Sequence, residues 1–324
     1  MKYYFAPMEG ITLYPLRNIH NSMFGDSIDR YYTPFITATH NFHFKKREKR
    51  DALFENSPAF ENDKGRICAQ IMAGRPDTFL WAAVEMKKLG YEEVNLNLGC
   101  PAPTVVNRHK GAGLLLDTDY LDGMLKEIFD KLPPFSEGGI DVSLKTRLGF
   151  YDEDEAEKLM AIYAGYPIKE LIIHSRVRED YYKGSPRIDA FCRAVQVYRE
   201  NGGKAPVCYN GNVFRADDKE LMGRIEGICD AVMLGRGIME NPALARELKG
   251  GEPLNDAELK EYLEKLYYGF AEYIPEDRNV IFKMLEHWAF LAARYPDREK
   301  ELKAIRKSRS KGEYFAAVNN FFSK

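Results

Sequence analysis

The chain has 324 residues, of which 45% are hydrophobic and 13% aromatic, and this composition excludes a disordered protein. The formal net charge of −2 excludes a strong overall positive field of the kind that attracts nucleic acids. Five cysteines without metal-ligand spacing, and no apolar run of membrane-spanning length, argue against a disulfide framework and against a membrane protein. We therefore expect a reduced, soluble, cytoplasmic protein that binds no metal.

Eight short β-rich runs alternate with helical patterns over the first 245 residues. A helix typical of the series follows the third run, because Pro76 suits a first helical turn, Phe79 and Met86 share one face, and Gly90 supplies the stop. Such alternation predicts a (β/α)8 barrel over residues 1–245, with an open doubly wound sheet as the alternative. Residues 35–65 carry only a weak pattern. The β-rich runs are 3–6, 29–33, 67–71, 93–98, 141–146, 170–174, 206–210 and 230–234.

The strand pattern stops after about residue 245, and helical patterns replace it. Apolar residues recur in three stretches at the spacing of a helix that buries one face. We therefore predict a small all-α helical-bundle domain over residues 246–324 with a core of its own. The three sets are Leu259, Tyr262, Leu263, Leu266, Tyr267 and Phe270; Ile281, Met284, Leu285, Trp288, Ala292 and Tyr295; and Tyr314, Phe315, Val318, Phe321 and Phe322.

The last two predicted strands end in glycine-containing sequences, "NGNV" from Asn210 and "GRGI" from Gly235. Active sites of (β/α)8 barrels lie at the carboxyl ends of the strands, and the loops after strands 7 and 8 are the usual phosphate site. Arg236 would add a cation whose planar fork suits a phosphate. A phosphate-bearing cofactor or substrate is therefore expected; the alternative is that these glycines serve only tight turns.

Cys100 stands out among the cysteines because it follows a predicted strand, on a loop directed towards the expected site. Gly99 lets the backbone approach a ligand closely, and Pro101 favours an extended conformation at Cys100. We expect a functional thiol at this position. Buried structural thiols are expected for the remaining cysteines, Cys68, Cys192, Cys208 and Cys229.

Further polar residues lie at or near strand ends, and each has a structural alternative. Lys145 lies inside a strand, where a buried lysine needs a partner. His174 could contact a ligand or could be a hydrogen-bonded core histidine. Gln70 could hydrogen-bond the neighbouring backbone, and Asn97 could be a structural bridge.

Several pieces of the chain, taken in order, resemble the tRNA-dihydrouridine synthases. They extend over the whole predicted barrel, while the helical tail resembles the C-terminal domain of that family more loosely. The pieces are "APMEGIT" at 6–12, "AQI" at 69–71, "NLNLGCP" at 95–101, "LKTRLG" at 144–149, "HSRVREDYYKG" at 174–184, "YNGNV" at 209–213 and "MLGRGIMENPAL" at 233–244.

The resemblance implies a flavin-binding barrel with a helical domain that uses FMN and NADPH to reduce uridine in tRNA to dihydrouridine. It also implies that Cys100 is the catalytic acid and that Asn97 and Arg176 contact the uracil. The residues implied to bind FMN are Pro7, Met8, Glu9, Gln70, Lys145 and His174 around the ring, and Asn210, Gly211, Asn212, Gly235 and Arg236 around the phosphate.

The chemistry of the reaction is consistent with these roles. Reduction of the uracil C5–C6 bond needs a hydride at C6, which a flavin supplies, and a proton at C5. A thiol with an ordinary pKa of about 8.5 is mostly protonated at neutral pH and can donate that proton. The rival role for Cys100 is a nucleophilic thiolate that attacks C6. We favour the acid.

Basic clusters indicate how tRNA would be bound, once the target base has been extruded into the pocket. Residues 294–311 carry eight Lys and Arg against three Asp and Glu, and "HFKKREKR" at 43–50 is a second cluster. Lys283, His287 and Arg294 share one face of a predicted helix, so we expect Lys283 and His287 to contact tRNA. A solvated surface is the alternative for any one of these runs.

Two parts of the sequence differ from the pattern that the resemblance leads us to expect. Leu13 replaces an Asp that many members carry, and "RHKGAG" at 108–113 is bulkier and more basic than expected. The main alternative function is an FMN-dependent barrel reductase acting on a free pyrimidine or another small enone. A non-enzymatic RNA-binding protein and a flavin-free lyase or isomerase are further alternatives. We expect a monomer, and the sequence contains no signal for the uridine position or for NADPH against NADH.

Overall fold

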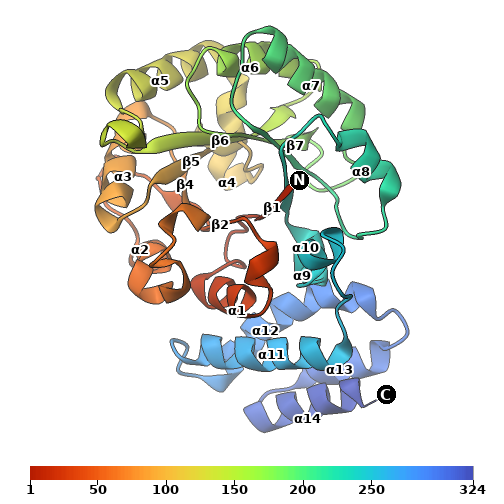
Figure 1. Cartoon of the computed structure of the whole chain (residues 1–324). Helices are drawn as coiled ribbons and strands as arrows, with labels where there is room; N and C mark the ends of the chain where they lie inside the picture. Colours follow the sequence, from red (N-terminus) through yellow and green to blue (C-terminus); the bar gives the residue numbers. More distant parts are fainter. Residues whose placement is uncertain (324) are drawn as a thin grey trace.

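Eight parallel strands form a closed barrel in the computed structural model, which describes residues 1–323 (Figure 1). The barrel closes because β1 pairs with both β9 and β2, and β2 pairs with β4. This closure confirms the predicted barrel and rules out the open sheet. The barrel strands are β1 (Lys2–Phe5), β2 (Arg30–Tyr32), β4 (Ile67–Met72), β5 (Glu93–Asn97), β6 (Asp141–Gly149), β7 (Leu171–Val177), β8 (Val207–Asn210) and β9 (Ala231–Leu234).

Helices surround the barrel and bury their apolar faces against its outer surface (Figure 1). The helix after β4 begins with Pro76 at its first turn and ends at Gly90, whose φ of 102° is the left-handed conformation that glycine adopts without strain. The helices of this part of the chain are α1 (Tyr14–Phe24), α2 (Lys46–Ala52), α3 (Pro76–Leu89), α4 (Pro103–Val106), α5 (Thr118–Lys131), α6 (Glu155–Ala164), α7 (Ile188–Glu200), α8 (Lys219–Ile225), α9 (Arg236–Glu240) and α10 (Leu244–Leu248).

The strands differ from the sequence prediction in their carboxyl ends. β6 extends to Gly149 and β7 to Val177, so Arg147 and Arg176 lie within strands rather than after them. The weakly patterned region contains an unpredicted strand, β3 (Ile36–Thr37), which pairs with the end of β4. Two residues are too few to produce a detectable alternation.

The amino-terminal end of the barrel is filled by a buried polar cluster. Glu170 accepts hydrogen bonds from the hydroxyls of Tyr4 at 2.7 Å and Tyr32 at 3.0 Å. Arg30 pairs with Glu93 at 2.6 Å, directly beside this carboxylate. Burial, together with the charge of Glu93, raises the pKa of Glu170. Ligand binding is thereby left to the carboxyl end of the barrel.

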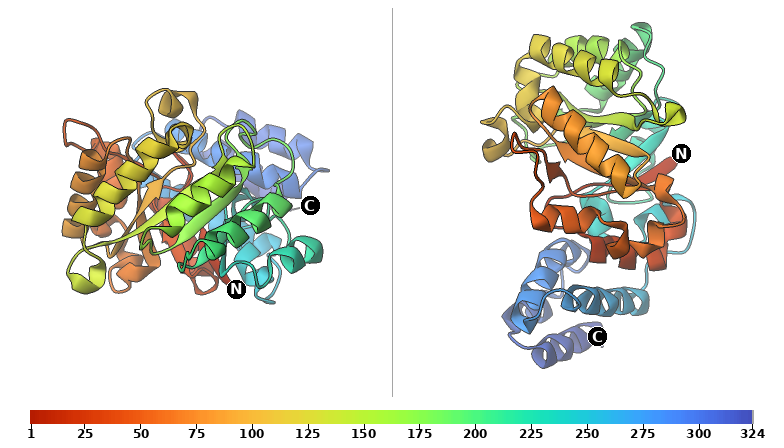
Figure 2. Two further views of the ribbon diagram at one scale, coloured as in Figure 1. Left: turned by 90° about the horizontal axis from the view of Figure 1, so that it is seen from above. Right: turned by 90° about the vertical axis from the view of Figure 1, so that its left-hand side faces the viewer.

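The C-terminal helices lie beside the barrel rather than around it (Figure 2, right). Their predicted apolar stripes are buried, and Tyr267 stacks on Tyr314 with ring centroids 5.4 Å apart. The group contacts the barrel through α1 and α9. Its division from the barrel at residues 245 and 246 stays a prediction. The helices are α11 (Asp256–Ala271), α12 (Asp277–Leu291), α13 (Glu299–Lys307) and α14 (Lys311–Phe322).

No helix within residues 1–323 is both long enough and apolar enough to cross a membrane.

Candidate active site

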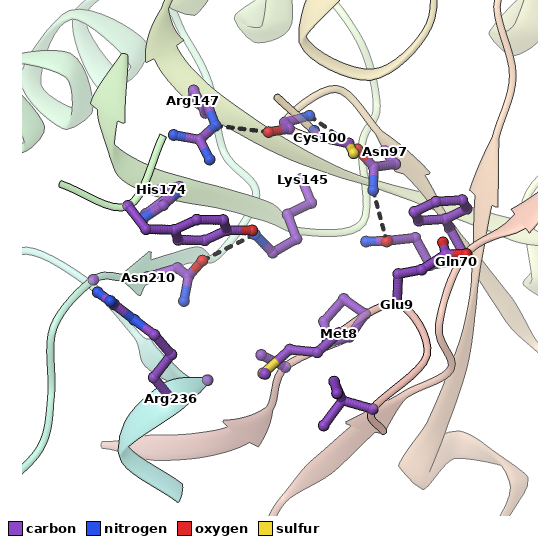
Figure 3. A pocket seen from close by; sticks show the side chains of 18 of the residues that line it. Met8, Glu9, Gln70, Asn97, Cys100, Lys145, Arg147, His174, Asn210 and Arg236 are labelled. Carbon is purple, nitrogen blue, oxygen red and sulfur yellow. Dashed lines mark hydrogen bonds between the residues drawn. The ribbon is translucent and has the colours of Figure 1, made fainter. Parts of the chain in front are cut away.

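A cavity of about 470 Å³ opens at the carboxyl end of the barrel (Figure 3). Its wall collects side chains from the ends of most barrel strands, as a (β/α)8 active site does. The sequence-predicted residues that line it are Pro7, Met8, Glu9, Gln70, Asn97, Cys100, Lys145, His174, Asn210, Gly211, Asn212, Gly235 and Arg236. Arg176, Lys283 and His287 were also predicted as site residues, and they do not line it.

A network of amide side chains holds the loop from Cys100 to Gly113, here called the Cys100 loop, in place on one side of the cavity. The Asn97 Oδ1 atom accepts hydrogen bonds from the backbone N–H groups of Gly99 at 3.0 Å and Cys100 at 2.9 Å. The Asn97 Nδ2 atom donates to Gln70 Oε1 at 2.8 Å (Figure 3), and Gln70 Nε2 donates to Asn95 Oδ1 at 2.9 Å. Asn97 therefore acts in this arrangement as the structural bridge that the sequence left open.

The Cys100 thiol is half-buried at the cavity wall, and its burial raises the pKa of the thiol above the ordinary value. A thiol in this state stays protonated at neutral pH, which suits a proton donor. The loop closes behind it, since the Ala112 N–H donates to the Cys100 carbonyl at 3.0 Å. Gly111 has φ of +55°, and a Cβ there would lie 2.9 Å from that same carbonyl oxygen. Only glycine fits this position without displacing Cys100.

Lys145 and His174 line the cavity together with Cys100. Lys145 donates from Nζ to Asn210 Oδ1 at 2.9 Å (Figure 3), which is the partner that a buried lysine needs. Burial, and next the charge of Arg147, lower the pKa of Lys145 to about 8, so the amine is still mostly protonated at neutral pH. Burial and the same arginine hold the pKa of His174 well below its usual range. His174 is therefore a neutral imidazole.

The loops after β8 and β9 meet at the far end of the cavity. Arg236 donates from Nη2 to Asn212 Oδ1 at 2.7 Å, so the side chain that follows β9 is oriented by the loop that follows β8. The Arg236 guanidinium also lies 5.6 Å from the centre of the Tyr182 ring. A fixed cation beside two glycine-containing loops has the chemistry of a phosphate site.

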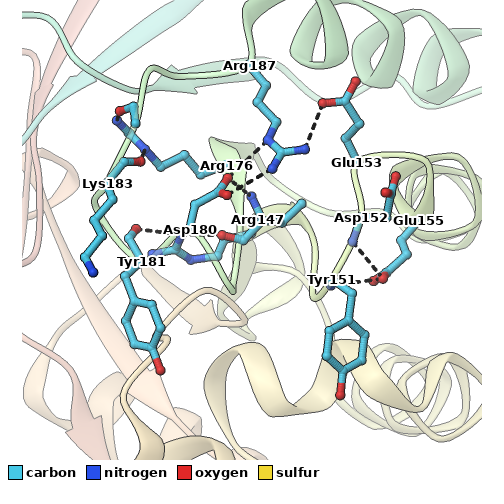
Figure 4. Close-up of polar contacts among 12 residues, drawn as sticks. Arg147, Tyr151, Asp152, Glu153, Glu155, Arg176, Asp180, Tyr181, Lys183 and Arg187 are labelled. Atoms are coloured by element: carbon cyan, nitrogen blue, oxygen red, sulfur yellow. Dashed lines mark hydrogen bonds and ion pairs between the residues drawn. The ribbon is translucent and has the colours of Figure 1, made fainter.

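The loop between β7 and α7 is fixed by arginines (Figure 4). Arg187 forms two hydrogen bonds with Asp180, at 2.9 and 3.1 Å, and Arg147 donates to the carbonyl of Tyr181 at 3.1 Å. Arg176 donates to the carbonyls of Lys183 at 3.2 Å and Gly184 at 2.6 Å, and its side chain is fully buried. The expected contact of Arg176 with uracil stays a prediction, although this arrangement does not favour it. Its guanidinium lies behind the wall and holds the loop.

The predicted tRNA contact of His287 is not favoured by the structure. His287 is 2% exposed and stacks on Phe270 with centroids 5.5 Å apart, because the apolar face of α12 turns it towards the helical core. Lys283 is more accessible, but its Nζ donates to the Gly10 carbonyl at 2.8 Å and pairs with Glu286. Lys283 thus ties α12 to the loop after β1, and its tRNA contact stays a prediction.

Some cavity residues were not assigned a role from the sequence. Arg147 donates from Nε to the Gly99 carbonyl at 2.6 Å, and so connects β6 with the Cys100 loop. The sequence could have indicated a role for Arg147, because it lies two residues after Lys145 and therefore on the same face of one strand. Tyr182 lies within a sequence piece already quoted. Phe35 and Phe290 also line the cavity, and Phe290 comes from α12, so only the tertiary structure could identify it.

Within residues 1–323, no three His, Cys, Asp or Glu side chains are grouped so that they could hold a metal ion.

A family model and the related proteins that match this chain carry the same name, dihydrouridine synthase. The family model described as "Dihydrouridine synthase (Dus)" matches residues 4–313. A tRNA-dihydrouridine(16) synthase of Neisseria meningitidis serogroup A is 30% identical over 283 residues, 85% of this chain and 80% of that protein. One from Ralstonia nicotianae is 28% identical over 270 residues, 81% of this chain and 79% of that protein.

Among solved structures, morphinone reductase in complex with tetrahydroNAD aligns with a TM-score of 0.54 at 12% identity, over 78% of this chain and 88% of that one. TcOYE with pHBA aligns with a TM-score of 0.53 at 10% identity, over 84% of this chain and 95% of that one. At such identity these similarities establish the barrel fold alone.

Proposed function

Because this chain belongs to the dihydrouridine synthase family, we propose how its cavity carries out the reduction of uridine in tRNA to 5,6-dihydrouridine. One observation carries the proposal. A protonated thiol, Cys100, lies in a single cavity with Lys145, Gln70 and Arg236, which come from separate strand ends. A proton donor, hydrogen-bonding groups for a heteroaromatic ring and a cation for a phosphate are thus available together.

FMN fits the groups that line the cavity. Gln70 keeps one amide N–H and one lone pair free beyond its bonds to Asn95 and Asn97, so it can pair with the polar edge of a flavin ring. Lys145 would stabilise negative charge at that edge, and Arg236 with the backbone after Asn210 would hold the phosphate. When bound, FMN would supply a hydride to uracil C6.

In the proposed reaction the protein itself supplies the proton. The Cys100 Sγ atom would donate its proton to uracil C5, and burial favours this role over nucleophilic attack because it keeps the thiol protonated. Asn97 and Arg147 would direct the thiol, since both bind the backbone of its loop. Solvent would return the proton to Cys100 after each turnover.

We propose NADPH as the reductant and tRNA as the macromolecular partner. The family supports the tRNA assignment, and NADPH would supply the renewable hydride that the chemistry needs. The names of the related Neisseria and Ralstonia proteins refer to position 16 of tRNA.

The test is dihydrouridine content, mapped by position, in tRNA from a strain that lacks the gene. Wild-type, Cys100→Ala and Cys192→Ala genes are restored separately; Cys192 is a half-buried thiol on α7 that does not line the cavity. We expect loss at specific positions, rescue by wild type and Cys192→Ala, and no rescue by Cys100→Ala. Unchanged dihydrouridine at every position, without a second synthase to account for it, would refute the proposal and favour a small-molecule enone reductase.

A further inference from the structure

A second cavity of about 440 Å³ adjoins the first on the other side of Cys100. Glu9, Phe35 and Cys100 line both cavities, so the two share a wall. The rest of the lining of the second cavity comes from the end of β4, from β3, from the beginning of α2 and from the loop that includes α4. Of the residues that line only the second cavity, Lys45 and Glu48 alone belong to a segment with a tRNA-binding role above, the basic cluster at 43–50.

We propose that the second cavity binds the nucleotide adjacent to the target uridine in the tRNA chain. The proposal rests on the function proposed above. A uridine extruded into the first cavity remains covalently joined to its neighbours, and a neighbour must occupy space that borders the first cavity. The shared wall at Phe35 and Cys100 provides such a border.

The charges of the second cavity suit a phosphodiester. Arg108 lines it, and the Arg108 side chain makes no hydrogen bond or ion pair with any residue in the described range 1–323. Lys45 also lines it; its side chain is 72% exposed and has only a 3.4 Å ion pair with Glu48. Arg108 is therefore free to bind an RNA backbone, and the exposed Lys45 could exchange its ion pair for one with a phosphate. Lys110 adds a third cation, although its Nζ already donates to the Ala38 carbonyl at 2.7 Å.

The carboxylates of the second cavity do not cancel this preference. Glu48 accepts hydrogen bonds from the backbone N–H of Thr37 at 3.0 Å and from its hydroxyl at 3.2 Å, so its charge is directed towards β3. Burial, and next the charge of Glu48, raise the pKa of Glu9. Three cations, Lys45, Arg108 and Lys110, thus line the second cavity against two carboxylates, Glu9 and Glu48.

The uncharged part of the lining suits a base. Phe35 offers an aromatic surface, and Met72 and Val105 are apolar, while Thr37 and Thr104 provide hydroxyl groups. Proteins recognise unpaired nucleotides by stacking on aromatic side chains combined with cations at the backbone. The volume lies within the range of about 300–1,000 Å³ that is usual for small-ligand sites. An unpaired nucleotide with its phosphate fits this combination.

The experiment measures steady-state reduction of a tRNA transcript by the flavin-loaded enzyme. The variants are Arg108→Ala, Lys45→Ala and the double variant, with Lys204→Ala as the matched control; Lys204 is exposed and lies before β8, at the opposite end of the barrel. We expect the double variant to raise KM for tRNA about tenfold with kcat within about twofold, and to make KM less dependent on salt. Lys204→Ala should match wild type.

A second measurement identifies the occupant. Transcripts carry an abasic nucleotide immediately 5′ or 3′ of the uridine that the wild-type enzyme reduces. One of them should raise KM for wild type several-fold. In the double variant the same transcript should cause a smaller relative increase, because part of the contact has already been removed.

The outcomes separate the two proposals. If the wild-type enzyme reduces no uridine in any tRNA, the proposed function fails. If wild type is active but the double variant keeps its KM for tRNA, with unchanged melting temperature and flavin content, the second cavity does not bind RNA. If KM rises for NADPH and not for tRNA, the cavity binds the reductant, and the inference is overturned.

Discussion

At the scale of single residues, the Cys100 thiol is the group on which the proposed proton transfer depends. Replacement by Ala removes the proton at Sγ while leaving a Cβ for the loop to pack. We expect kcat for tRNA reduction to fall by about 10²–10⁴-fold, the usual contribution of a general acid, with flavin content unchanged. Single-turnover rates of flavin-loaded enzyme measure this. A loss smaller than about tenfold would contradict the assignment of Cys100 as the acid.

Lys145 gives a second residue-scale prediction, this time on pH. Burial and Arg147 lower its pKa to about 8 in the cavity without a ligand, so the cation is present below that pH and is lost above it. We expect the affinity of the apoprotein for FMN to fall as pH rises through about 8, by up to about tenfold per pH unit. Lys145→Gln should bind FMN more weakly and without this pH dependence. Fluorescence titration of FMN between pH 6.5 and 9.5 is the measurement, and an identical pH profile for the variant would refute the role.

At the scale of elements, the loop from Cys100 to Gly113 positions the acid through its backbone. Gly111→Ala would force a Cβ against the Cys100 carbonyl at a residue with φ of +55°. Gly138→Ala is the matched control, since Gly138 has φ of +78° but no atom within 4 Å of the position that a Cβ would take, at the opposite end of the barrel. Both should cost roughly 1–3 kcal/mol of stability from the positive φ.

Activity should separate these two variants. We expect Gly111→Ala to lower kcat by at least about tenfold, because the displaced backbone carries Cys100 with it, while Gly138→Ala keeps near wild-type kcat below its melting temperature. Melting curves and single-turnover rates on the same preparations test this. Equal activity of the two variants would show that the Cys100 loop tolerates the displacement.

At the scale of the whole molecule, two buried histidines connect stability to pH. Burial lowers the pKa of His20 and of His287 to about 3 in the folded protein, below the ordinary 6.5. The unfolded chain therefore takes up protons that the folded chain does not, so these groups reduce stability as pH falls from about 6.5. The raised pKa of Glu170 has the opposite sign, since its protonated form is favoured by folding and stability is lost as pH rises through that pKa.

The two histidines should respond differently to replacement by Leu. His20 bonds the Tyr31 hydroxyl at 2.8 Å and the Pro242 carbonyl at 2.9 Å, whereas neither ring nitrogen of His287 has a partner within residues 1–323. We expect His287→Leu to raise the melting temperature and to flatten its decline below pH 6.5. His20→Leu should lower the melting temperature at neutral pH, because buried polar groups lose their partner. Thermal unfolding between pH 4.5 and 7.5 measures both, and destabilisation by His287→Leu at pH 5 would contradict the argument.

The barrel and most of the cavity could be anticipated because their signals are local. Strand positions follow from short β-rich runs, and residues at the ends of parallel strands converge once the barrel closes. Lys145, Asn210 and Arg236 therefore meet as expected. Arg176 did not follow this rule: it lies on the same side of β7 as His174, but its guanidinium is held by the carbonyls of Lys183 and Gly184 and does not line the cavity.

By itself, the sequence determined the order of strands and helices, the position of Cys100 after its strand and the family of the chain, because each depends on spacing along a continuous segment. Only the tertiary structure decided which polar side chains are accessible. It buried His287 in the helical core, placed Phe290 at the cavity and formed the second cavity from β3, α2 and the Cys100 loop. Burial and shared walls arise from contacts between segments distant in sequence, and no local pattern encodes those contacts.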